Sequence, residues 1–119
     1  YAYARITGIM RLAFERDLDF SEGDVRLLTH DAEKALIKKM LLLPELIESI
    51  SLNLEPHHLP HYAIDLATAF HWFYQQCRVV SDQPGDGTVT LARLKLVEAC
   101  RIVLLRCLSL MNMSAPDHM

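Results

Sequence analysis

The stretch from His57 to Val80, HHLPHYAIDLATAFHWFYQQCRVV, constrains the fold of this chain more than any other segment. Its apolar residues recur in alternating steps of four and three, the spacing that places side chains along one face of an α-helix. A continuous apolar seam of this length predicts a helix that packs against other helices. The seam consists of Leu59, Ala63, Leu66, Phe70, Phe73, Cys77 and Val80.

A second stripe follows the same spacing on another face of this predicted helix. It contains Ala67, and then His71, Tyr74 and Arg78, each one helical turn after the last. An aromatic ring beside a guanidinium can stack on a nucleic-acid base and pair with a phosphate. The same residue types also occur on helix surfaces that simply face solvent. The stripe alone leaves both interpretations open.

The opening segment, Tyr1 to Arg16, repeats this arrangement of an aromatic residue and an arginine. Tyr1 and Arg5 are four residues apart and share a helix face, which suggests that both pairs face one target. The alternative is an exposed arginine beside a terminal tyrosine. The predicted buried face of this segment consists of Ile6, Met10, Ala13 and Phe14.

Two shorter helices are predicted between the opening segment and the 57–80 stretch. After a loop over residues 17–24, Thr29 is expected to cap a helix that has acidic residues in its first turn and lysines near its end, as the helix dipole favours. Pro44 begins a third helix, which should end near Glu55 because Pro56 disfavours a helical conformation in the residue before it. Their predicted buried residues are Ala32, Ala35, Leu36, Met40, Leu43, Leu46, Ile47, Ile50 and Leu54.

The last helix is predicted from Thr90 to about Asn112, after the loop sequence SDQPGDGT. It carries two adjacent apolar seams, which favours a position in the middle of a bundle. The seams are Leu96, Cys100, Val103, Cys107 and Leu110, and beside them Leu94, Val97, Leu104, Leu108 and Met111. No segment shows sustained alternation of period two, so no sheet is expected. The sequence therefore predicts one all-α domain over residues 1–119, an antiparallel bundle of about five helices.

Charge and composition limit the classes of function. The formal net charge of −3 argues against a strongly basic, sequence-independent nucleic-acid binder, so any contact with nucleic acid must use a local patch. No apolar run approaches the roughly 20 residues of a membrane-spanning helix, so no membrane partner is expected. Cys77, Cys100 and Cys107 all lie in apolar seams, which favours reduced thiols in a cytoplasmic protein. The chain opens without Met on a helix already under way, which suggests a fragment of a longer protein.

Catalytic and metal-binding patterns are missing from the sequence. The serines lack a Gly-x-Ser-x-Gly context, and the cysteines have no obvious histidine partner. His57 and His61 would share a helix face, with His58 beside them, but no carboxylate or cysteine falls at ligand spacing nearby. The glycines of SDQPGDGT lack the spacing and the lysine of a phosphate-binding loop. We therefore expect no catalytic and no metal-binding residue in this chain.

Four segments, taken in order, resemble the C-terminal DALR anticodon-binding domain of arginyl-tRNA synthetases. They are YAYARI, LTHDAEKALIKKMLLLPELI, LPHYAIDLATAFHWFYQQCRVV, and RLKLVEACRIVL with the ending SAPDHM. The resemblance covers almost the whole chain and implies the helical bundle of class I synthetase anticodon-binding domains. It implies that an upstream catalytic domain of the same protein joins arginine to its tRNA through an arginyl-adenylate, using ATP and magnesium. The present fragment would hold no cofactor.

The resemblance also implies which residues face the RNA, and that the partner is the anticodon stem-loop of arginine tRNA, with no DNA partner. Tyr74 is the expected stacking platform, and Arg5 and Arg78 would contact phosphates or base edges. Two alternatives stay open: the equivalent domain of another class I synthetase, such as the cysteinyl enzyme, and a helical protein–protein adaptor, whose binding would depend little on salt. The full set of implied RNA-binding residues is Tyr1, Arg5, Tyr74, Arg78 and the terminal Met119, with His71 as a further candidate.

Overall fold

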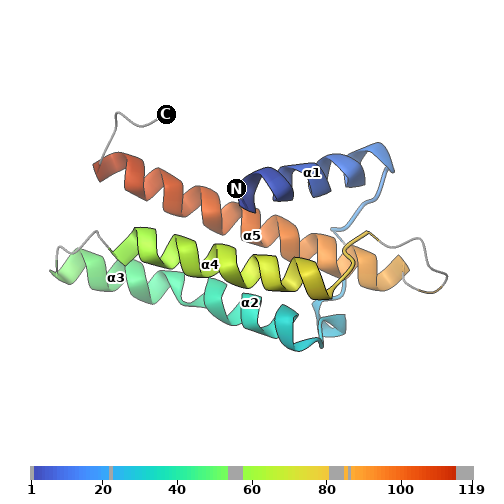
Figure 1. Ribbon diagram of the computed structural model, residues 1–119, viewed down its shortest axis with the longest axis horizontal. Helices are drawn as coiled ribbons and strands as arrows, with labels where there is room; N and C mark the ends of the chain where they lie inside the picture. Colours follow the sequence, from blue (N-terminus) through green and yellow to red (C-terminus); the bar gives the residue numbers. More distant parts are fainter. Residues whose placement is uncertain (1, 22, 54–57, 81–84, 86, 115–119) are drawn as a thin grey trace.

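The fold consists of α-helices packed antiparallel, with α2 and α3 following one another in the same direction (Figure 1). The computed structural model describes residues 2–21, 23–53, 58–80, 85 and 87–114, and it contains no strand in these residues. Helix α5 runs back along both α1 and α4, while α2 and α3 together run against α4 (Figure 1). The predicted all-α antiparallel bundle is confirmed. The elements are α1 (Ala2–Glu15), the short 3-10 helix η1 (Val25–Leu27), α2 (Asp31–Leu41), α3 (Leu43–Asn53), α4 (His58–Gln76) and α5 (Gly87–Ser114).

Helices α4 and α5 supply most of the buried core. The predicted seam of α4 is confirmed, because Leu59, Leu66, Phe70, Phe73 and Cys77 are all buried. Helix α5 is buried on two adjacent faces, as a central helix should be, and its buried apolar residues include Leu94, Leu96, Val97, Cys100, Leu104 and Cys107. Both seams follow from helical periodicity, since burying apolar area drives the helices together.

Two residues predicted to be buried are exposed. Phe14 is 86% exposed, whereas the preceding Ala13 is buried. A helix turns about 100° per residue, so Ala13 takes the position towards the core and Phe14 points away from it. Leu108, near the end of α5, is 42% exposed. The last turns of α5 extend beyond the start of α1, so α1 does not cover them (Figure 1).

Helix α2 begins one residue later than predicted, and its cap is His30 rather than Thr29. The Nδ1 atom of His30 accepts a hydrogen bond from the backbone N–H of Ala32 at 3.0 Å. In return, a carboxylate oxygen of Glu33 accepts the backbone N–H of His30 at 2.9 Å, which completes a capping box. Threonine is the better cap by intrinsic preference, but the glutamate three residues after His30 fixes the start of the helix.

Helix α4 ends at Gln76, four residues before the predicted end at Val80. The backbone N–H of Cys77 still donates to the carbonyl of Phe73 at 2.9 Å, and the chain then leaves the helical path. The carbonyl of Arg78 accepts a hydrogen bond from the side chain of Arg93 on α5 at 3.0 Å. Periodicity could not predict this ending because it involves a tertiary contact.

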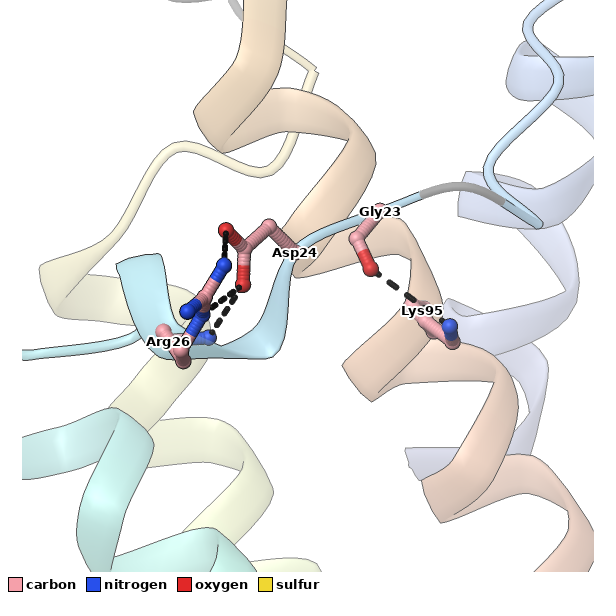
Figure 2. Close-up of polar contacts among 4 residues, drawn as sticks. All are labelled: Gly23, Asp24, Arg26 and Lys95. Atoms are coloured by element: carbon pink, nitrogen blue, oxygen red, sulfur yellow. Dashed lines mark hydrogen bonds and ion pairs between the residues drawn. The ribbon is translucent and has the colours of Figure 1, made fainter.

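The loop between α1 and η1 packs directly on the backbone of α5. Figure 2 shows Lys95 of α5 reaching the carbonyl of Gly23 in this loop, at 3.4 Å from its Nζ atom. The same Nζ atom also donates to the carbonyl of Ser21 at 3.2 Å. A Cβ atom on Gly23 would lie only 2.5 Å from the carbonyl oxygen of Leu91. Next in the chain, Asp24 accepts the backbone N–H of Arg26 at 3.0 Å and caps η1 (Figure 2). Glycine is therefore needed at position 23 to let the loop approach α5.

The three cysteines are free and buried, as the sequence predicts. Burial raises the pKa of the Cys100 thiol to about 12 and that of Cys107 to about 11, because the thiolate would lose its hydration. Within the described residues, no helix has the length and apolar character needed to cross a membrane.

Candidate nucleic-acid interface

The structure brings Arg5 and Tyr74 into direct contact. Arg5 lies near the start of α1 and Tyr74 near the end of α4, and the Cζ atom of Arg5 lies over the Tyr74 ring, 4.4 Å from its centroid. Tyr74 remains 38% exposed. A guanidinium on an aromatic face at such an exposed site is stabilised by about 0.5–1 kcal/mol. The two aromatic–arginine patterns seen in the sequence therefore contribute one residue each to a single surface.

The ring of Tyr74 is supported by the core. The buried Phe70 lies one turn earlier on α4, with its ring centroid 6.2 Å from that of Tyr74 and the two planes tilted by 30°. Offset and tilted aromatic pairs of this kind are favourable. The exposed ring of Tyr74 therefore has stabilising contacts with both Phe70 and Arg5.

A pocket of about 520 Å³ opens beside this pair, between α1 and the end of α4. This size is within the range of small-ligand sites, about 300–1,000 Å³. Among the described residues that line the pocket, Arg78 alone is charged, and none of them is a carboxylate. Burial raises the pKa of the Cys77 thiol, which keeps that part of the wall neutral. The lining residues are Ile9, Leu12, Tyr74, Gln75, Gln76, Cys77, Arg78, Val79 and Val80.

The residues predicted from the sequence are placed as follows. Arg5, Tyr74 and Arg78 come together, since Tyr74 and Arg78 line the pocket and Arg5 covers the Tyr74 ring. His71 is partly buried one turn before Tyr74, and its ring meets that of Phe70 edge-on at 6.0 Å, so it does not line the pocket. Tyr1 and Met119 lie outside the described residues, and their predicted RNA contacts stay predictions. His57 and the predicted buried residue Leu54 also lie outside the described residues.

Seven of the described pocket residues were not predicted as site residues; two of these, Cys77 and Val80, were predicted as parts of the apolar seam. Ile9 and Leu12 follow Arg5 at steps of four and three on α1, so the helical spacing already placed them on the same face. Gln75 and Gln76 adjoin Tyr74 and offer both hydrogen-bond donors and acceptors. Their only signal in the sequence is a polar pair at the end of a long apolar stretch.

A helical bundle that presents a guanidinium–aromatic pair beside a pocket lined by an arginine belongs to the class of domains suited to bind unstacked nucleic-acid bases. Residues 1–119 match the family model described as the DALR anticodon binding domain. The chain belongs to this family.

Curated relatives resemble the chain over its entire length. It is 56% identical to the arginine–tRNA ligases of two strains of Dehalococcoides mccartyi, and 44% identical to that of Moorella thermoacetica. Each alignment covers 100% of the chain and 21% of the relative, so the chain spans about a fifth of the length of these proteins. No solved structure matches the chain significantly.

Proposed function

We propose that this chain is the anticodon-binding domain of an arginine–tRNA ligase and binds the anticodon stem-loop of arginine tRNA. Membership of the family over residues 1–119 and the similarity to arginine–tRNA ligases support this proposal and favour arginine over another amino acid. The structural observation that carries it is the guanidinium of Arg5 on the exposed ring of Tyr74, at the edge of a pocket that Arg78 also lines.

The bases of an anticodon loop are single-stranded and can be splayed out onto such a surface. Because Arg5 already covers one face of the Tyr74 ring, an incoming base would stack on the outer plane of the guanidinium, with Tyr74 as the support behind it. Guanidinium planes stack on bases as aromatic rings do. A base stacked in this way contributes about 1–3 kcal/mol. In this arrangement the platform is the Arg5–Tyr74 pair rather than Tyr74 alone.

The pocket beside the pair would receive the edge of a base. Ile9 and Leu12 form an apolar side, and the amides of Gln75 and Gln76 can pair with donors or acceptors on a base edge. Arg78 supplies a cation for the phosphate backbone. The acidic net charge of the chain is compatible with this function, because the contact needs only a local cationic patch.

The longer protein would carry out the remaining steps. We propose that a catalytic domain upstream of residue 1 attaches arginine to the tRNA with ATP and magnesium, in the cytoplasm, and that this chain contributes anticodon recognition without a cofactor. Tyr1 and Met119 remain proposed RNA contacts. Residues 1–119 would act by positioning the tRNA for the catalytic site of the upstream domain.

A titration tests the function directly. The chain is titrated with an arginine anticodon stem-loop at about 50 and 200 mM salt, since each phosphate contact to a single strand adds about 0.7 to the slope of log affinity against log salt. A stem-loop with the middle anticodon base changed, and a cysteine tRNA stem-loop, serve as controls. We expect binding that weakens with salt and with either change of RNA. Binding that ignores both salt and sequence would contradict the proposal and favour the adaptor.

A further inference from the structure

An ion pair with a buried carboxylate joins α2 and α5, and its arginine also contacts the segment that carries Arg78. Glu33 of α2 is 1% exposed, and its carboxylate lies 2.6 Å from the Nε atom of Arg93 on α5. A second nitrogen of the same guanidinium, Nη1, donates to the backbone carbonyl of Arg78 at 3.0 Å. Arg93 thus links α2 and α5 to the segment that follows α4.

The hydrogen bonds of Glu33 and Arg93 form a connected series, in which each bond restricts the geometry of the next. The carboxylate of Glu33 cannot rotate freely, because its other oxygen accepts the backbone N–H of His30 in the capping box. The planar guanidinium of Arg93 presents its donors in a fixed geometry, so binding Glu33 at Nε determines where Nη1 points. Nη1 in turn fixes the carbonyl of Arg78. The backbone of Arg78 is therefore tied to α2 and α5 through Arg93.

The hydrogen bond from Arg93 restrains the backbone of Arg78, which lies beyond the end of α4. Helix α4 ends at Gln76, so Arg78 lies outside the regular hydrogen bonds that hold Tyr74. The side chain of Arg78 is exposed, and Arg78 is the charged residue of the pocket wall. An exposed arginine on a segment without such a restraint would lose more conformational freedom on binding, which weakens affinity.

We propose that Arg93 is a positioning residue for RNA binding: anchored by Glu33, it holds the backbone of Arg78 so that the Arg78 side chain faces the RNA. This inference rests on the proposed function. Arg93 itself need not touch RNA, since two of its nitrogens are already engaged within the protein.

The variant Arg93→Lys tests the proposal. A lysine keeps the positive charge beside Glu33, but its single ammonium lacks the planar fork that serves Glu33 and the Arg78 carbonyl together. We expect the affinity for the arginine anticodon stem-loop to fall about five- to tenfold, the effect of losing one hydrogen bond of ordinary strength. The salt slope should fall by about 0.7, as for Arg78→Ala. Circular dichroism checks that the helices remain.

A double-mutant cycle separates positioning from a general loss of stability. If Arg93 acts through Arg78, then Arg93→Lys has no further effect on affinity or salt slope in an Arg78→Ala background. Arg101→Lys is the matched control on α5, because Arg101 makes a two-nitrogen pair with Glu98 and should not change RNA affinity. Additive effects of Arg93→Lys and Arg78→Ala, or an unchanged affinity of folded Arg93→Lys, would overturn the inference.

A measurement on the unsubstituted chain covers the case in which Arg93→Lys does not fold. The Nε–H signals of the arginines are followed by nitrogen-15 NMR during titration with the stem-loop. We expect the Arg78 signal to shift while the hydrogen-bonded Arg93 signal persists without a cross-peak to RNA. A direct cross-peak between Arg93 and RNA would overturn the positioning role. Absence of any binding by the unsubstituted chain would instead count against the proposed function itself.

Discussion

The contact between the loop at Gly23 and α5 makes a sharp prediction about stability. A Cβ atom on Gly23 would lie 2.5 Å from the carbonyl oxygen and 2.8 Å from the carbonyl carbon of Leu91, well inside the 3.4 Å at which ordinary contact begins. Both of these atoms belong to the backbone of α5, which cannot move aside as a flexible side chain would. The variant Gly23→Ala must therefore displace the loop that Lys95 holds on α5 (Figure 2).

The size of the effect follows from two opposing terms. Forcing an extra carbon into a packed site costs about 1–3 kcal/mol. Replacing glycine by alanine also restricts the unfolded chain, which stabilises the fold by about 0.4–1 kcal/mol. The cost of overpacking is the larger of the two terms, so the free energy of unfolding should fall by about 1–2 kcal/mol. For a domain of this length, the corresponding loss in Tm is about 3–10 °C.

Thermal unfolding followed by circular dichroism measures this effect, with Gly8→Ala as the matched control. Gly8 is exposed in α1, and a Cβ atom there has no neighbour within 4 Å. Alanine is the better helix former, so this control should stabilise the chain by about 0.5–1 kcal/mol. The two identical substitutions should thus have opposite signs. A Tm for Gly23→Ala at or above that of the unsubstituted chain would refute the close approach of the loop to α5.

Three further predictions concern the site, the buried ion pair and the thiols. Arg5→Ala should weaken binding of the arginine anticodon stem-loop by about 1–3 kcal/mol in a fluorescence titration, and unchanged affinity would remove Arg5 from the platform. Glu33→Ala should lower the free energy of unfolding in urea by about 2–4 kcal/mol, because Arg93 loses its buried partner, whereas Glu98→Ala at a more exposed pair should cost under about 1 kcal/mol. Equal losses of unfolding free energy in Glu33→Ala and Glu98→Ala would contradict this prediction. Burial raises the pKa of the Cys100 thiol from 9.0 to about 12, so the unfolded chain releases that proton first as the pH rises. The stability due to Cys100 should therefore be complete below pH 9 and decline from there towards pH 12, and a rise with pH in urea melts over that window would contradict it.

The helices and their buried faces could be predicted from the sequence because both depend on periodicity. The seam of α4 and the double seam of α5 follow directly from spacings of three and four. The predicted helix ends differ from the observed ones where side-chain contacts outside the apolar pattern fix the end of the helix. His30 replaces Thr29 as the cap because Glu33 completes the box, and α4 ends at Gln76 where Arg93 takes up the carbonyl of Arg78. A pattern within one helix carries no information on such contacts.

The candidate site could be predicted in part. Local spacing identified Arg5, Tyr74 and Arg78, but it paired Arg5 with Tyr1 and Tyr74 with Arg78 as separate stripes. The structure instead places Arg5 over Tyr74, because α1 and α4 lie side by side. The pocket could not be predicted, since its two sides come from helices far apart in the sequence.

The central claim is that an anticodon loop binds at the Arg5–Tyr74 pair and the adjoining pocket. The most direct test is to follow the backbone amide signals of nitrogen-15-labelled chain during titration with the arginine anticodon stem-loop. We predict the largest changes where α1 meets the end of α4, at Arg5, Ile9, Tyr74, Gln75, Gln76 and Arg78. The changes should weaken as salt is raised. Saturable changes centred instead on the opposite face of α4, around Ile64, Thr68 and Trp72, would contradict the site.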